Sequence, residues 1–63
     1  MDADDVRVKN ALSHLRQAIA LLSEVEYTHA SEEVREDVSL ARMDAHVAAA
    51  FCASVLEMRG VEA

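Results

Sequence analysis

Proline and tryptophan are absent from this 63-residue sequence, and glycine, cysteine, tyrosine and phenylalanine each occur once. With no proline and only Gly60, the chain has few residues that end helices or build tight turns, so its helices should be long. The single cysteine, Cys52, excludes an internal disulfide. A single domain this short buries a small share of its surface, so oligomerisation or regular helix packing must supply stability.

Long apolar runs and a targeting segment are also missing from the sequence. No uninterrupted apolar run approaches the roughly 20 residues that a membrane-spanning helix needs. The first ten residues, MDADDVRVKN, are acidic and lack the basic and then apolar pattern of a signal peptide. These features predict a cytoplasmic protein without a membrane partner, in which the cysteine stays reduced.

Acidic residues outnumber basic ones by twelve to six, and the formal charge of the chain is −6. This balance disfavours direct binding to nucleic acid or to an anionic membrane, because both carry negative charge. It is compatible with a basic protein partner, and also with solubility alone.

Apolar residues that recur in alternating steps of four and three predict two helices in a single all-α domain. The first helix should span about residues 3–27 and the second about residues 32–59, joined by a turn at about residues 28–31. The packed face of the first is Val8, Leu12, Leu15, Ile19 and Leu22. That of the second is made mostly of small residues, which allow close approach: Val34, Val38, Ala41, Ala45, Ala48, Cys52 and Val55.

The expected turn has the features of a helix start. Ser31 precedes two glutamates, as an N-cap residue does, although Thr28 could cap equally well. No glycine marks the end of the first helix, so a single long bent helix is an alternative. We favour an antiparallel hairpin, because one continuous amphipathic helix would need a partner along its whole length. Gly60 predicts the end of the second helix.

The apolar residues cover close to half the circumference of each helix, more than two helices packed only on each other need. The additional residues are Leu21, Leu40, Val47, Phe51 and Met58. Burial stabilises by about 25 cal/mol per Å², against about 1.5 kcal/mol lost per ordered residue, so a hairpin that exposed them would be unstable. We expect them to form an interface, either in a homodimeric four-helix bundle or with a different protein.

Two carboxylates, Asp37 and Asp44, interrupt the wide apolar side of the second helix. Buried carboxylates would need partners, so we expect both at the solvated rim of the interface. The alternative is a set of ion pairs across the interface with Arg7, Lys9 or Arg16, although exposed pairs contribute little.

Few residues of the sequence could act as catalytic groups or metal ligands. Glu26 and His29 have the Glu-x-x-His spacing that di-iron bundles use on two helices, but the second helix has no such pair. We expect them to cap the bundle, with Glu26 meeting a basic residue of a second chain. His14 and His46 should lie apart on the surface, and Cys52 should be a small core residue. The sequence predicts no catalytic residue, no metal ligand and no cofactor.

In architecture the chain resembles the Rop-type plasmid copy-number regulators, which are dimers of helical hairpins. The likeness covers the whole chain: its length, a turn near residues 29–31, and small residues with a cysteine along the second helix. It implies a dimer. Rop-like RNA binding uses polar, basic and aromatic residues on the outer face of the first helix. Asn10 fits that pattern in type, but His14, Ala18 and Val25 do not, so the resemblance does not extend to RNA.

These features predict a small acidic, non-catalytic protein-interaction module that acts as a regulator, adaptor or inhibitor. One alternative is an acidic mimic of nucleic acid, of the phage or plasmid type, that blocks a DNA- or RNA-binding protein. The other is a metal-binding helical bundle that uses Glu26 and His29.

Overall fold

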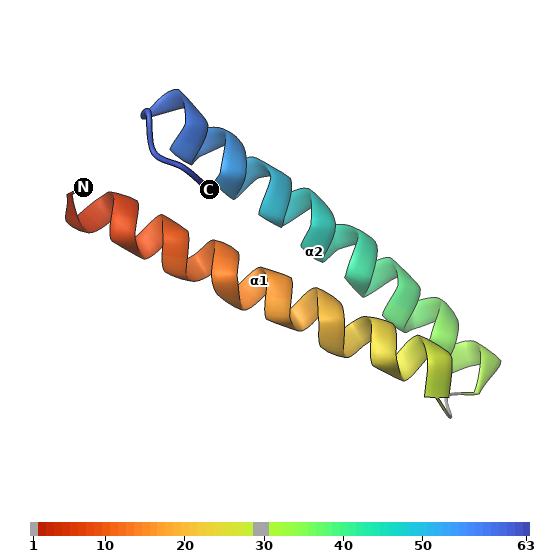
Figure 1. Cartoon of the computed structure of the whole chain (residues 1–63). Coiled ribbons are helices and arrows are strands. Elements are labelled where there is room, and N and C mark those ends of the chain that lie inside the picture. Colours follow the sequence, from red (N-terminus) through yellow and green to blue (C-terminus); the bar gives the residue numbers. More distant parts are fainter. Residues whose placement is uncertain (1, 29–30) are drawn as a thin grey trace.

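The protein is a hairpin of two α-helices in the computed structural model, which describes residues 2–28 and 31–63. Helix α1 (Ala3–Thr28) and helix α2 (Glu32–Met58) lie side by side and antiparallel (Figure 1). The molecule measures 43 × 14 × 13 Å, so it is one helix pair wide. The predicted all-α hairpin is therefore confirmed, with helix bounds within one residue of those expected, and the single bent helix is excluded.

Helix α2 begins as the sequence predicted. The hydroxyl of Ser31 accepts a hydrogen bond from the Val34 N–H at 3.3 Å, which makes Ser31 the N-cap. Thr28 belongs to α1 instead, and its hydroxyl donates to the Glu24 carbonyl at 2.8 Å. Two consecutive glutamates occupy the first turn of α2, where the helix dipole favours negative charge.

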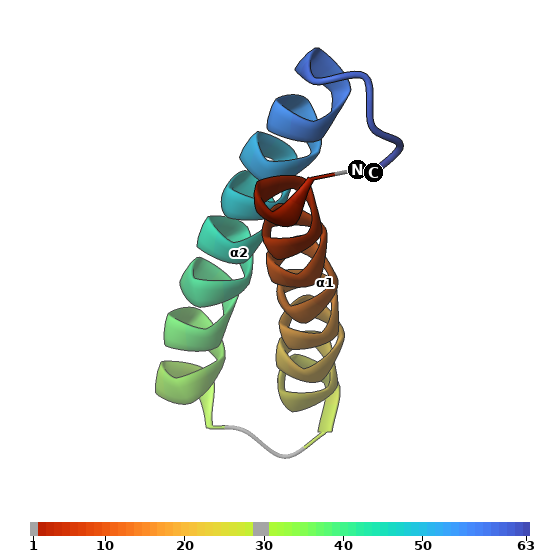
Figure 2. The same cartoon turned by 90° about the vertical axis from the view of Figure 1, so that its left-hand side faces the viewer.

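Helix α2 ends at the predicted glycine. Gly60 has a φ of 75°, a conformation that glycine adopts at little cost. Its N–H donates to the Glu57 carbonyl at 3.0 Å, and the Val61 N–H donates to the Leu56 carbonyl at 2.8 Å. This pair of bonds is a Schellman motif. It turns the last residues back toward the start of α1 (Figure 2).

The hydrophobic core is small. Within residues 2–28 and 31–63, the buried hydrophobic side chains are Leu12, 2 % exposed, and Leu56, fully buried. The rest of the face predicted for α1 is half-buried against α2 and is confirmed: Val8, Leu15, Ile19 and Leu22. The α2 side of the contact consists mainly of small half-buried residues: Val38, Ala45, Ala48, Ala49, Cys52 and Ala53.

The packed face predicted for α2 was partly wrong. Val34, Ala41 and Val55 are exposed, whereas Arg42 and Leu56, which the periodicity did not single out, face α1. The apolar arc of α2 is broad, and the prediction placed its contact line near the middle of that arc. Helix α1 packs against one edge of the arc instead, so the remainder of it stays uncovered.

Candidate interaction surface

The five residues predicted to form an interface are all exposed in the hairpin. Their exposed fractions are 62 % for Leu21, 61 % for Leu40, 55 % for Val47, 69 % for Phe51 and 86 % for Met58. The four on α2 are spaced by seven, four and seven residues, so at about 100° per residue they lie within roughly 40° of one another. We call these four the outer apolar row.

A second apolar strip continues around α2 from the outer row toward the contact with α1. It consists of Val34, Ala41 and Val55, which the sequence had assigned to the packed face and which are exposed here. By the same helical arithmetic, Ala18 and Val25 flank the contact on the matching side of α1. We call these five residues the apolar side of the hairpin. Together with the outer row they leave one flank of the molecule largely apolar.

An ion pair joins the two helices near the turn. The Arg42 Nε donates to the Glu26 Oε2 at 2.6 Å, and the two side chains are only 30 % and 17 % exposed. We had expected Glu26 to meet a basic residue of a second chain, and this was wrong, because its partner belongs to the same hairpin. The two residues are 16 positions apart in sequence, so no local sequence pattern could predict the pair.

A second charged cluster ties the helices together at the open end of the hairpin. Arg59 bonds through Nε to buried Asp5 and through Nη2 to Asp2, the latter at 2.8 Å. The Asp5 carboxylate, followed by that of Asp2, raises the pKa of Arg59. Asp2 also caps α1 by accepting from the Asp5 N–H at 2.9 Å, and this bond is the main reason that the pKa of Asp2 is lowered.

The two carboxylates that interrupt the apolar arc, Asp37 and Asp44, are exposed, as rim residues would be. In the part of the chain that the structure describes, neither has an ion-pair partner within 4.0 Å. Arg7, one of the cations considered for them, pairs with Asp4 at 3.2 Å in a fully solvated contact. Ion pairs of these aspartates across an interface remain a prediction.

The candidate metal site is not assembled by the described residues. His29 lies outside them, and the carboxylate of Glu26 is engaged by Arg42, which a cation would have to displace. Over residues 2–28 and 31–63, no three His, Cys, Asp or Glu side chains gather as metal ligands would. His14 and His46 are exposed on separate helices, and Cys52 is a half-buried free thiol.

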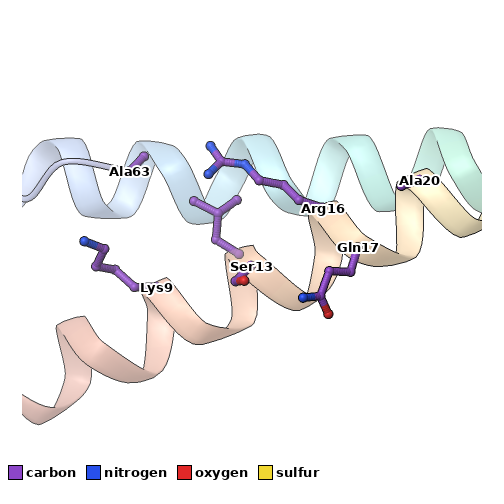
Figure 3. Close-up of a pocket in the computed structure, with 7 residues that line it drawn as sticks. Lys9, Ser13, Arg16, Gln17, Ala20 and Ala63 are labelled. Atoms are coloured by element: carbon purple, nitrogen blue, oxygen red, sulfur yellow. The ribbon is translucent and has the colours of Figure 1, made fainter.

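Figure 3 shows a hollow of about 510 Å³ that the sequence did not predict. At about 100° per residue, the α1 residues that line it lie on the flank opposite the apolar side. The lining of the hollow comes from α1 and from the returning end of the chain: Lys9, Leu12, Ser13, Arg16, Gln17, Ala20 and Ala63. It forms because the Schellman motif folds the last residues over α1. Among the described residues no buried side-chain nitrogen or oxygen lacks a hydrogen-bond partner, so the hollow presents no such group to a ligand.

By length and composition, helix α2 is apolar enough to cross a membrane. Such a helix was not expected from the sequence, because no uninterrupted apolar run is long enough. One 18-residue window reaches a mean hydropathy of 1.2, and no residue of this window is fully buried in the hairpin. Arg42 and Asp44 interrupt this helix, and charged side chains within a bilayer are costly. The same composition suits a helix that is covered by another protein.

Comparison with protein-family models, with curated proteins and with solved structures finds no match to this chain.

Proposed function

We propose that this protein is a small non-catalytic interaction module of the cytoplasm that forms a homodimer, and that the dimer binds another protein. The observation that carries the proposal is the outer apolar row of Leu40, Val47, Phe51 and Met58, which is more than half exposed at every position. Contiguous exposed apolar surface of this kind marks association sites in soluble proteins.

The size of the hairpin supports a second copy as the first partner. In the part of the chain that the structure describes, the core consists of two buried leucines and a strip of alanines, which is small. Short chains with a small core gain stability from oligomerisation. In a four-helix bundle each helix contacts two neighbours. Helix α2 is apolar over an arc wide enough for two contacts, of which α1 occupies one.

The dimer would leave an acidic exterior for a second, basic protein partner. Association through that exterior, or through any part of the outer row left uncovered, would act by occlusion or tethering, as a regulator, adaptor or inhibitor does. Complementary charge would speed the encounter and select the partner.

An acidic mimic of nucleic acid is the second candidate, and the clustering of carboxylates around the turn favours it. Residues 24–37 contain six carboxylates and a single arginine. A mimic would bind a basic DNA- or RNA-binding protein, and that binding would weaken steeply between low and physiological salt. Binding that is insensitive to salt would exclude this candidate.

Sedimentation equilibrium on the purified protein, with metal analysis of the same sample, tests the proposal. A metal-free dimer supports it. A monomer at every concentration contradicts the homodimer, and stoichiometric metal would favour a metal-binding bundle instead.

A further inference from the structure

We infer that the two copies associate antiparallel, with the turn end of one hairpin beside the open end of the other. The turn end is where α1 ends and α2 begins, and the open end is where α1 begins and α2 ends (Figure 1). The inference rests on the proposed homodimer and adds the orientation of the second copy.

Ion pairs between the helices show which residues lie level along the hairpin. Glu26 pairs with Arg42, and Asp5 pairs with Arg59. The midpoint of the hairpin, halfway between these pairs, therefore lies near residue 16 of α1 and residue 50 of α2. Residues 17–49 form the turn half, and the remaining residues form the open half.

Charge is divided unequally between these halves. The turn half carries seven carboxylates against two arginines, a formal charge of −5. The open half carries five carboxylates against four cations, a formal charge of −1. Most of the −6 charge of the chain is therefore at one end.

The open half also contains a segment that is purely basic. Between residues 6 and 23 the sequence has no carboxylate, and its cations are Arg7, Lys9 and Arg16. Residues 45–56 of α2, which lie level with this segment, carry no charged side chain. Of the cations of the open half, Arg7 pairs with Asp4 and Arg59 with Asp5 and Asp2, whereas Lys9 and Arg16 have no ion-pair partner among the described residues.

These charges favour one orientation of the second copy. A parallel dimer would place two −5 halves side by side, within a bundle whose helix axes are about 10 Å apart, close to the Debye length of about 8 Å at physiological salt. An antiparallel dimer would place each −5 half beside the −1 half of the other copy. Since the hairpin is 43 Å long, its two turn ends would then be too far apart to repel one another.

Covering the apolar side by a second copy also accounts for its small residues. Ala18 and Ala41 leave room for close approach of another helix, while Val25, Val34 and Val55 supply apolar area around them. In this arrangement Asp37 and Asp44, which border the apolar side, would face the open half of the partner copy, whereas a parallel dimer would bring them beside the same two aspartates of the partner copy.

Distances between spin labels on the two copies test the orientation. In a Cys52→Ala background, Glu36→Cys places one label per chain near the turn end, and His46→Cys places a control label near the midpoint. An antiparallel dimer predicts label separations on the order of 40 Å at position 36, from about 14 residues on either side of the midpoint at about 1.5 Å each. It predicts a separation on the order of 20 Å or less at position 46.

The label distances test the orientation of the two copies, and sedimentation tests the homodimer itself. Short distances at both positions, on the order of 20 Å, would overturn the antiparallel orientation and leave the homodimer intact. If sedimentation of the labelled samples shows only monomer, or if the protein dissolves only with vesicles, the homodimer itself is contradicted.

Discussion

Two arginines connect the helices of this hairpin at its ends. Arg42 binds Glu26 near the turn, and Arg59 binds Asp5 and Asp2 at the open end. Both arginines reach residues far away in sequence, so periodicity alone gave no indication of these partners. They fix the longitudinal register that the mostly small side chains between them specify weakly.

Phe51 should contribute more to association than any polar residue near it. It is 69 % exposed in the hairpin and belongs to the outer apolar row, so Phe51→Ala removes a large apolar side chain from the proposed interface. We expect about a tenfold or greater loss of dimer affinity, measured by sedimentation at low concentration. His46→Ala, on an exposed polar position, is the matched control. Equal affinities of the two variants would exclude a role for the outer row.

Asp2 should make the stability of the protein depend on pH in the acidic range. Its pKa is lowered below 3.8, chiefly because its carboxylate accepts from the Asp5 N–H. A carboxylate with a lowered pKa stabilises the fold above its unfolded-state pKa, and this contribution is lost as the pH falls through the folded-state value. The parent protein should therefore lose more stability on acidification below pH 3.8 than Asp2→Asn, in which asparagine can still cap α1.

Thermal melts at several acidic pH values measure this difference. Asp4→Asn serves as the control, because the ion pair of Asp4 with Arg7 is exposed to solvent. Parallel pH profiles for the parent and Asp2→Asn would show that the cap is not formed in solution.

At the level of the helix, α2 is defined by its two ends and by an apolar arc broader than the hairpin uses. Ser31 starts the helix and Gly60 stops it, and both were predictable because capping depends on residues adjacent in sequence. The face that packs on α1 was predicted only in part, because several apolar lines run along the same arc. The row of α2 residues that packs on α1 is decided by how the side chains of α1 fit against it, and this fit cannot be read from the sequence of α2 alone.

Gly60 should be needed for its backbone conformation alone. A Cβ added there would meet no atom within 4 Å, but the φ of 75° is strained for residues with a Cβ. We expect Gly60→Ala to lower the free energy of unfolding by about 1 kcal/mol in urea melts. Gly60→Asn should cost less, since asparagine tolerates this conformation. An alanine variant as stable as the parent would mean that the Schellman motif does not persist.

On the scale of the whole molecule, the hairpin has one largely apolar flank and one polar flank. The apolar flank gathers the outer row and the apolar side, while the polar flank carries the hollow beside Lys9 and Arg16. The two flanks differ, and the buried hydrophobic core of residues 2–28 and 31–63 consists of Leu12 and Leu56 alone. For these reasons we propose that association stabilises the fold.

A charge on the close-packed face of α2 should disrupt the whole molecule. Ala45 is half-buried against α1, so Ala45→Glu places a carboxylate where small residues allow the helices to approach. We expect a loss of about 2 to 3 kcal/mol, enough to prevent folding or association of a small domain, measured by urea melts. The adjacent exposed position gives the control, His46→Glu, which should remain close to the parent. An Ala45→Glu variant as stable as the parent would contradict the packing described for α2.

The sequence by itself determined the all-α class, the bounds of the two helices, the glycine that ends α2 and the identity of the extra apolar side chains, but it left the N-cap of α2 open between Ser31 and Thr28. These depend on local propensity and on periodicity, which act over a few residues at a time. The tertiary structure alone decided the face of α2 that meets α1, the pairing of Glu26 with Arg42 and of Asp5 with Arg59, and the hollow under the returning chain. Each of these joins residues distant in sequence, and their positions become known only when both helices are placed together.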